Sequence, residues 1–419
     1  MSALTDPPPP LEPDAELAAW AASGAMSLTG RVGQEPLGPP VGLVGRLAAL
    51  GRELRDAAQA VGGQLDVDPL ALLGERAAIA GLHRRGSTSV GGATRLIASG
   101  DTWIAVSLAR PDDVALVPAW LELESASDDP WTDIAAAART RPPSDLVARA
   151  RWLGLPAAVL GEAAATGRAP VRRERLGAAP VSASLEGATV VELGSLWAGP
   201  LCGSLLQMAG AMVVKVESTH RPDGARRGPR GFFDLLNAGK RSLSLDLSSG
   251  AGARALALVI ARADVVIEAS RPRALEQLGV RAVDVVSGGG PRVWVSITGH
   301  GRLAPGADWV AFGDDAAVAG GLVARDEQGP AFCADAVADP ISGVVAAGEA
   351  LQALAAGGRW LLDVSLSAVA AAAAGATRVV TRPLEAAAPR ARPATGRGPH
   401  LGEHNAALLE GTATAGSGR

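Results

Sequence analysis

Residues 188–218 read ATVVELGSLWAGPLCGSLLQMAGAMVVKVES, and this stretch decides the predicted fold. Its first eight residues form a short apolar run typical of a buried strand. A helix is predicted to open at Pro200, because proline suits the first turn, and to close near Gly210. Residues 211–218 form the next predicted strand. A strand, a helix and a second strand at this spacing predict a parallel pair.

The same alternation continues toward the C-terminus. Further strands are predicted at 242–247, 263–269 and 292–299, with helices between them. An Ala-rich helix is expected at roughly 341–355. The predicted fold class is therefore α/β, with a doubly wound parallel-sheet large domain.

The N-terminal half has a different organisation. Helices are predicted at 43–60 and 66–83, and a Gly-rich loop at 89–95 precedes a strand at 102–109. This half predicts a smaller α+β domain. The expected divisions are a disordered tail at 1–15, a helical segment at 16–79 that packs on the large domain, the small α+β domain at 80–165, a linker at 166–184, the large domain at 185–382 and a Pro/Gly-rich C-terminal tail at 383–419.

Composition excludes several classes of protein. The 419 residues carry 39 Lys and Arg against 43 Asp and Glu, so no basic field attracts nucleic acid. Cys202 and Cys333 are too few for a disulfide framework or a zinc site. The acidic, Pro-rich start lacks the features of a signal peptide, and no run reaches membrane-spanning length. We expect a cytoplasmic protein with no membrane or nucleic-acid partner.

An internal repeat is predicted from three matched pieces in one order. Residues 21–73 and 317–370 share this order with an offset near 297. The alternative is that Ala/Gly-rich helices resemble one another by composition.

Asp339 is the strongest candidate for chemistry. It stands just before the Ala-rich helix, where it could cap the helix N-terminus or serve as a carboxylate nucleophile. At the equivalent place the first repeat copy has Val41 or Gly42, with no acid. Capping alone therefore does not require the Asp, and we favour the nucleophile.

Two further segments could bind a ligand. Lys240 and Arg241 precede a predicted strand beside Asn237, and adjacent cations suit a phosphate or diphosphate, although a solvated basic turn is the alternative. The turn Ala198-Gly199-Pro200 could present helix N–H groups to a ligand.

The histidines point less clearly to a site. His300 follows a predicted strand end, where open sheets hold ligands, but a loop histidine is more often solvated. HLGEH at 400–404 has an i,i+4 spacing but lies in the Pro/Gly-rich tail, so no metal site is predicted. No Gly-x-Ser-x-Gly elbow supports a serine hydrolase.

Taken together, these segments resemble the family III CoA-transferases, which include formyl-CoA transferase, carnitine CoA-transferase and α-methylacyl-CoA racemase. The resemblance covers about 188–370. The motifs that carry it are AGP at 198–200, VVKVE at 213–217, NAGKRS at 237–242, EASRP at 268–272 and SITGHG at 296–301, in the family's order.

The resemblance implies a mechanism and a set of site residues. Asp339 would attack an acyl-CoA thioester to form a mixed anhydride, and the released CoA thiolate would then form an aspartyl thioester. An acceptor carboxylic acid would complete the exchange, with CoA as substrate and product and no permanently bound cofactor. The implied CoA-binding residues are Ala198, Gly199, Pro200, Asn237, Lys240, Arg241 and Arg271.

The N-terminal half resembles the part of the family that normally follows the catalytic Asp. The chain is thus similar to a permuted or half-duplicated member with the small domain first. Gly91 and Gly92 would match the mobile glycine loop over the substrate. The resemblance also implies a symmetric homodimer.

Departures from the family pattern leave three functions open. Glu268-Ala269-Ser270 replaces the family's "ENF" step, and Gly313-Asp314-Asp315 replaces the racemase "GHD" step. The missing histidine argues against racemisation. The first hypothesis is a CoA-transferase, the second an acyl-CoA racemase or isomerase that uses Asp339 with another acid, and the third a catalytically silent CoA-binding subunit.

Overall fold

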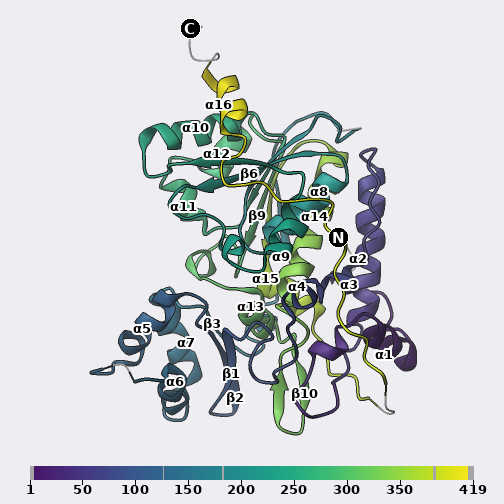
Figure 1. Cartoon of the computed structure of the whole chain (residues 1–419), viewed down its shortest axis with the longest axis vertical. Coiled ribbons are helices and arrows are strands. Elements are labelled where there is room, and N and C mark those ends of the chain that lie inside the picture. The colour runs from purple at the N-terminus through teal and green to yellow at the C-terminus, as the bar shows by residue number, and fades with distance from the viewer. Residues whose placement is uncertain (1–3, 126, 182–183, 381–383, 414–419) are drawn as a thin grey trace.

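A computed structural model describes residues 4–125, 127–181, 184–380 and 384–413. A twisted sheet lies at the centre with helices on both faces, and a smaller module projects from one end (Figure 1). The mixed α/β class with a large, mainly parallel sheet confirms that part of the prediction.

The central sheet has seven strands in the order β4-β12-β9-β8-β5-β6-β7. All neighbours are parallel except β4, which runs antiparallel to β12. The chain builds outward from β5 in one direction and from β8 in the other, which is the doubly wound pattern. The strands are β4 Val171–Gly177, β5 Thr189–Leu193, β6 Met212–Ser218, β7 Arg241–Leu245, β8 Val265–Glu268, β9 Val293–Thr298 and β12 Arg359–Ser365.

Alternate residues of each strand enter different cores. Val190, Val213 and Ile267 point to the face covered by α2, α8, α14 and α15, whereas Val191 and Val214 point to the face covered by α10, α11, α12 and α16. The bounds on the first face are α2 Leu43–Gln59, α8 Ala198–Met208, α14 Ala338–Ala356 and α15 Leu366–Ala373. Those on the second are α10 Gly250–Ala261, α11 Pro272–Glu276, α12 Ala282–Ser287 and α16 Asn405–Ala413.

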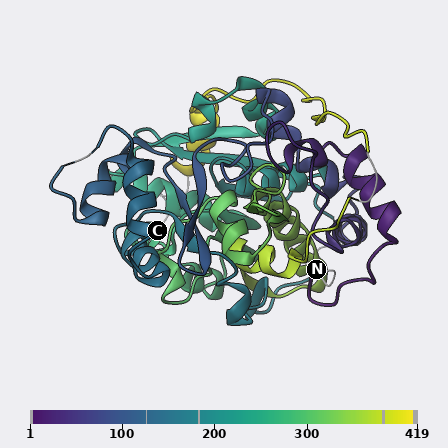
Figure 2. The same cartoon turned by 90° about the horizontal axis from the view of Figure 1, so that it is seen from below.

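A three-stranded antiparallel sheet and three helices form the small module, residues 94–159. Its core includes Ile104, Trp120 and Leu146, all nearly inaccessible, and is separate from the cores of the large sheet. Seen from below, the module lies at the opposite end of the molecule from α1, Pro13–Ala22 (Figure 2). Its elements are β1 Thr94–Ser99, β2 Thr102–Ser107, β3 Ala157–Val159, α5 Pro111–Leu121, α6 Pro130–Ala138 and α7 Pro143–Trp152.

The two repeat copies pack against each other through α2 and α14. A shift of 297 positions takes Gln59, the end of α2, to Ala356, the end of α14. The same shift takes Pro69, the start of α3 (Pro69–Leu72), to Leu366, the start of α15. The elements therefore recur in register as well as in order.

Several segments differ from their sequence-based descriptions. The linker expected at 166–184 contains β4, because its charged residues suit the exposed edge of a sheet. The helix expected at 66–83 is divided into α3 and α4 (Glu75–Ala80). β12 was not expected as a strand, since a short apolar run does not distinguish strand from helix.

The terminal predictions also differ in part. Leu4 is buried and α1 begins at Pro13, although most of the described residues between 5 and 15 are exposed. The expected 383–419 tail contains α16. Residues 1–3, 182–183, 383 and 414–419 of these segments lie outside the described residues.

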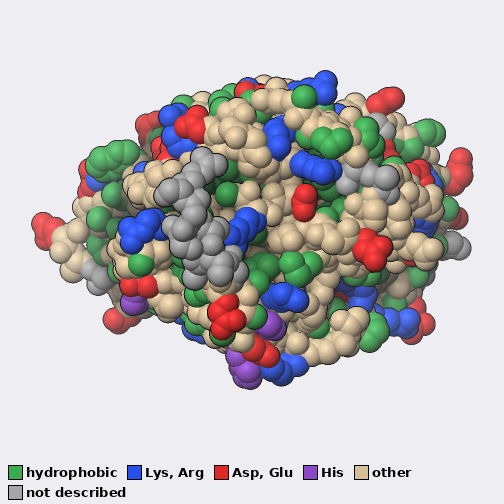
Figure 3. All heavy atoms as spheres, turned by 90° about the horizontal axis from the view of Figure 1, so that it is seen from above, with side chains coloured by type: hydrophobic (Ala, Val, Ile, Leu, Met, Phe, Trp, Pro, Cys, Tyr) green, Lys and Arg blue, Asp and Glu red, His purple; other side chains and the backbone are tan. Residues whose placement is uncertain are grey.

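The remaining elements connect the layers. They are α9 Arg230–Asn237, α13 Gly313–Gly320 and the hairpin β10 Ala324–Asp326 with β11 Gly329–Ala331. Acidic and basic side chains are interspersed on the face seen from above (Figure 3). No described helix combines the length and apolarity that crossing a membrane would require.

Candidate functional site

The AGP and EASRP turns meet where the strand order reverses. Ala198-Gly199-Pro200 follows β5 and opens α8, while Ala269 follows β8. A Cβ on Gly199 would lie 3.0 Å from the Cβ of Ala269, so the glycine permits this contact. The carboxyl ends of strands at such a reversal form the usual ligand crevice of a doubly wound sheet. The AGP turn thus packs against the turn that leads from β8 to Arg271.

Arg271 brings a positive charge to the turn that follows β8. Burial and the nearby charges of Arg273 and Arg110 lower the pKa of its guanidinium. The structure records no ion pair for Arg271 within the described residues, whereas Arg273 pairs with Asp308 at 3.3 Å. A half-buried guanidinium without a protein carboxylate is suited to bind an anionic ligand.

Asp339 is the second residue of α14 and is half-buried. The N-cap of α14 is Val337, with no side-chain hydrogen bond, so Asp339 does not cap its own helix. Its carboxylate instead accepts a hydrogen bond from the Gly313 amide at the start of α13. A Cβ on Gly313 would lie 2.6 Å from Asp339 Oδ2, so glycine is needed for this approach.

Asp339 lies close to the ligand crevice. One turn further along α14, a Cβ on Gly343 would lie 2.9 Å from the carbonyl oxygen of Ala198. The second turn of α14 therefore packs against the start of α8, one helical turn after Asp339. A cavity of about 570 Å³, lined by Arg173, Glu349 and other residues, lies further along α14 and does not include Asp339.

Three carboxyl groups cluster around this point, and burial is the main cause that raises the pKa of each. Burial, together with the charges of Asp314 and Asp315, raises the pKa of Asp339 to about 7, against the opposing charge of Arg76. Burial raises the pKa of Asp314 to about 6 and that of Asp315 to about 7. The Oγ of Ser107, from the small module, donates to Asp315 at 2.8 Å. These groups titrate near neutrality as a coupled set.

Lys240 occupies a different place from the one the sequence suggested. Its ammonium is fully buried and donates to Glu192 at 2.6 Å, to the Pro200 carbonyl at 2.8 Å and to Asn237 at 3.1 Å. The same Glu192 pairs with Lys215, which also pairs with Asp223. Lys240 and Asn237 thus support the start of α8 from beneath, and neither presents a polar group to solvent in this structure.

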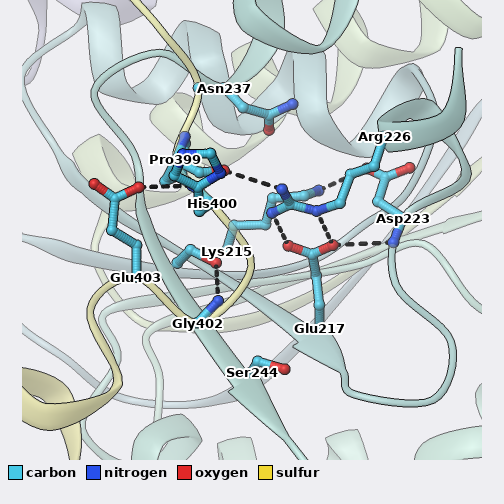
Figure 4. A network of polar contacts seen from close by, with 12 residues as sticks. Lys215, Glu217, Asp223, Arg226, Asn237, Ser244, Pro399, His400, Gly402 and Glu403 are labelled. Carbon is cyan, nitrogen blue, oxygen red and sulfur yellow. Dashed lines mark hydrogen bonds and ion pairs between the residues drawn. The ribbon is translucent and has the colours of Figure 1, made fainter. Parts of the chain in front are cut away.

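Neighbouring motif residues extend this network to the C-terminal segment (Figure 4). Glu217 accepts hydrogen bonds from Arg226 at 2.8 and 2.6 Å and from the Asp223 amide at 2.9 Å. Arg226 also donates to the Pro399 carbonyl at 3.0 Å. Much of the VVKVE and NAGKRS pattern is therefore explained by buried ion pairing.

Arg241 lies on the opposite face of the sheet from Asp339. It pairs in register with Val214, whose side chain enters the second core, and paired residues share a face. The expected clamp of two adjacent cations is therefore not formed, because consecutive side chains around a strand start point in opposite directions.

Arg76 of α4 lies between the glycine loop and the segment that carries Asp335. A Cβ on Gly91 would lie 3.0 Å from Arg76 Nη2, and one on Gly92, whose φ is 84°, would lie 2.6 Å from Arg85 Nη1. Arg76 Nε donates to Asp335 at 2.9 Å. Sequence reasoning missed both Arg76 and Asp335, because they are 259 positions apart and neither stands in a motif.

The histidines do not assemble a metal site. The His300 ring is buried against Trp309, with centroids 5.3 Å apart, and burial lowers its pKa to about 3. His404 Nδ1 accepts from the Ser242 amide at 3.1 Å, which attaches the C-terminal segment to β7. Within the described ranges, no three His, Cys, Asp or Glu side chains are arranged to hold a metal ion.

Comparison with known families agrees with this arrangement. The model of CoA-transferase family III matches residues 185–399, which is just over half of the chain and includes the crevice and Asp339. The chain belongs to CoA-transferase family III. Within this family III chain, Arg76, Ser107 and the glycine loop lie outside the matched residues.

Named relatives of this family III chain match only part of it. It is 29% identical over 180 residues to succinyl-CoA–D-citramalate CoA-transferase of Chloroflexus aurantiacus, covering 41% of this chain and 45% of the relative. It is 35% identical over 120 residues to human alpha-methylacyl-CoA racemase, covering 28% and 29%. A crystal structure of a CAIB/BAIF family protein from Brucella suis matches with TM-score 0.41 and 28% identity, covering 45% and 54%. The chain therefore spans less than half the length of these curated relatives.

Proposed function

We propose that this chain is a CoA-transferase that moves CoA between an acyl-CoA and a free carboxylic acid, with Asp339 as its nucleophile. The observation that carries the proposal is the position of Asp339. Asp339 lies one helical turn before Gly343, which packs against the Ala198 carbonyl of the AGP turn, and its carboxylate accepts a hydrogen bond from the Gly313 amide. The side chain of Asp339 is only partly buried, and a side chain at position 313 would collide with its carboxylate, so glycine there is needed for this arrangement.

In the proposed mechanism the Asp339 carboxylate carries first an acyl group, then CoA, then the acceptor acyl group, and is free again at the end. Asp339 attacks the thioester carbonyl and the carbon–sulfur bond breaks. CoA leaves as a thiolate, and the acyl group stays on Asp339 as a mixed anhydride. The thiolate attacks the Asp339 carbonyl carbon and expels the first carboxylate, which leaves an aspartyl thioester. The acceptor carboxylate attacks this thioester and displaces CoA, which then attacks the new acyl group and restores Asp339.

Crevice residues supply the proposed CoA contacts. Arg271 is suited to bind a CoA phosphate, and in this proposal the start of α8 contributes backbone N–H groups to the ligand. In this proposal Lys240 and Asn237 act beneath α8 rather than on the ligand, since their polar groups are already paired.

The test compares two substitutions at Asp339. Asn keeps an oxygen that accepts from Gly313 but cannot form an anhydride, so Asp339→Asn should abolish transfer and change the melting temperature little. With Asp339→Ala, the hydrogen bond is lost as well. Transfer is measured by chromatography of acyl-CoA products, and hydroxylamine trapping with mass spectrometry locates the acyl group. A fully active Asp339→Asn protein would reject the covalent mechanism.

A second candidate is an acyl-CoA racemase or isomerase. It is favoured by the clustering of Asp314 and Asp315 with Asp339, because carboxyl groups with pKa values of about 6 to 7 can exchange protons near neutral pH. Incorporation of solvent deuterium at the carbon next to the thioester, without any trapped acyl-aspartate, would select this alternative. Binding of CoA with neither reaction would select the silent CoA-binding subunit.

A further inference from the structure

Arg76 contacts the segment that leads into Asp339. It lies on α4, outside the residues that match the family model, and its guanidinium engages both carboxylate oxygens of Asp335. Asp335 is fully inaccessible to solvent, so this ion pair is largely shielded. A buried carboxylate of this kind depends on its partner, because an unpaired charge away from water is strongly unfavourable.

The segment held by Arg76 has an unusual backbone. Ala334 and Ala336, on either side of Asp335, have φ values of 54° and 43°, which side chains other than glycine adopt at a cost. The Ala334 amide donates to Thr29 Oγ1 at 3.0 Å, a second bond to the N-terminal part of the chain. This segment leads directly into α14, so these contacts help to fix the position of the first turn of α14 and of Asp339 within it.

Arg76 also balances the charge of the carboxylate cluster. Its positive charge is coupled to Asp335, Asp314 and Asp339, and its guanidinium lies 5.3 Å from the centre of the Trp197 ring. Gly91 packs on another side of it. The guanidinium is therefore partly buried between Asp335, Trp197 at the start of α8 and the glycine loop, where its charge is screened less than it would be in open water.

We propose that Arg76 is a positioning residue that keeps the Asp339 carboxylate ionised and correctly placed for acylation, an inference that rests on the proposed function. A nucleophilic carboxylate must be an anion, and burial with two acidic neighbours works against ionisation. Arg76 is the opposing charge among these contacts. The N-terminal segment thus contributes to the chemistry of a nucleophile that lies in the other half of the chain.

The experiment measures the ionisation of Asp339 in two ways. Hydroxylamine trapping with succinyl-CoA as the donor gives the rate of acylation from pH 5 to 9. Denaturant unfolding of each protein and its Asp339→Asn counterpart over the same pH range gives the Asp339 pKa without any substrate. The variants are Arg76→Met, Arg76→Lys and Asp335→Asn.

Arg392→Met is the matched control. Arg392 holds the neighbouring residue of the same helix, since its Nε donates to Glu75 at 2.6 Å. Its removal should weaken the attachment of α4 without changing the charge at Asp339. A general loosening of α4 would therefore affect Arg392→Met and Arg76→Met alike, whereas the proposed role is specific to Arg76.

Arg76→Met should raise the pKa of Asp339, which is the midpoint of its ionisation, by about one pH unit. The rate of acylation at pH 6 should then fall about tenfold. Arg76→Lys should restore most of this midpoint, because it keeps the charge. Asp335→Asn should lower the midpoint, since Arg76 is then free to act on Asp339. Arg392→Met should leave it unchanged.

The outcomes separate this inference from the proposed function. Midpoints that shift in unfolding, without acylation of the wild-type protein, would support the Arg76–Asp339 interaction and count against the transferase. Wild-type acylation with the same pH profile in Arg76→Met would overturn the role of Arg76. If Arg76→Met does not fold, an Asp335→Asn midpoint that fails to fall overturns it.

Discussion

Two equivalent positions in the repeat have exchanged an acid and a glycine. In the first copy Glu16 accepts from the Gly42 amide at 2.7 Å, and in the second copy Asp339 accepts from the Gly313 amide. The shift of 297 positions relates Glu16 to Gly313 and Gly42 to Asp339. Glu16 is fully buried and paired with Arg378 at 2.7 Å, so it is closed to a substrate. Of these two acids, only Asp339 of the second copy is partly exposed.

Arg271 and Arg241 form a matched pair for testing the ligand crevice. Arg271→Met should weaken CoA binding about tenfold or more, because it removes a half-buried cation from the proposed phosphate site. Arg241→Met should leave the affinity unchanged, since Arg241 lies on the other face of the sheet. Calorimetric titration with CoA measures both. If both substitutions change the CoA affinity equally, Arg271 does not bind a CoA phosphate.

Asp315 should make stability depend on pH. It is fully buried, and burial raises its pKa to about 7 from 3.8 in the unfolded chain. The folded state therefore holds a proton that the unfolded state loses, and stability falls as pH rises through this window. Relative to Asp315→Asn, the wild-type protein should lose about 1.4 kcal/mol per pH unit between about pH 4 and 7. Denaturant unfolding at several pH values measures this, and parallel curves would refute it.

At the scale of elements, α8 depends on one glycine that faces the sheet. A Cβ on Gly203 would lie 2.0 Å from Glu192 Oε2 and 3.3 Å from Lys240 Nζ. The buried ion pair of Glu192 and Lys240 fills the space that a side chain would need. Position 203 therefore requires glycine, because the side chains of Glu192 and Lys240 pack directly against the backbone of α8 there.

Gly203→Ala should therefore destabilise the protein by about 3 kcal/mol or more, as expected when a buried ion pair is disrupted. Gly45→Ala in α2 is the matched control, because its Cβ would meet Leu11 at an ordinary 3.7 Å. That substitution should stabilise by up to about 1 kcal/mol through helix propensity. Urea unfolding of both variants compares them, and a stable Gly203→Ala protein would contradict this account of α8.

At the scale of the whole molecule, the family-matched half depends on the N-terminal half. Leu43, Leu47 and Leu50 of α2 share one core with Val344 and Leu351 of α14. A fragment of residues 167–419 would expose this apolar surface of α14 to water. The homodimer implied by the resemblance stays a prediction, which light scattering at micromolar concentration tests.

The fragment 167–419 alone should therefore aggregate or bind a hydrophobic dye strongly. Co-expression of residues 1–166 as a separate chain should restore a soluble complex, because the core then closes without the covalent connection. Size-exclusion chromatography and dye fluorescence measure these outcomes. A soluble, cooperatively unfolding 167–419 fragment would show that the N-terminal half is not needed for the core.

The sequence by itself determined the parallel strands β5 to β9 and the position of the nucleophile candidate, but not β4 or β12. Apolar runs such as Val190–Val191 predict buried strands locally, and Asp339 stands out because its repeat counterpart has no acid. These signals are visible because each depends on neighbouring residues or on an order repeated along the chain.

Only the tertiary structure decided which polar residues surround Asp339. Lys240 was expected at a phosphate site, but its ammonium forms a buried ion pair with Glu192, 48 positions away in the chain. Arg76 was not expected, yet it reaches Asp335 from 259 positions away. A cation's role depends on which carboxylate folding brings to it, and such long-range pairing leaves no local pattern in the chain.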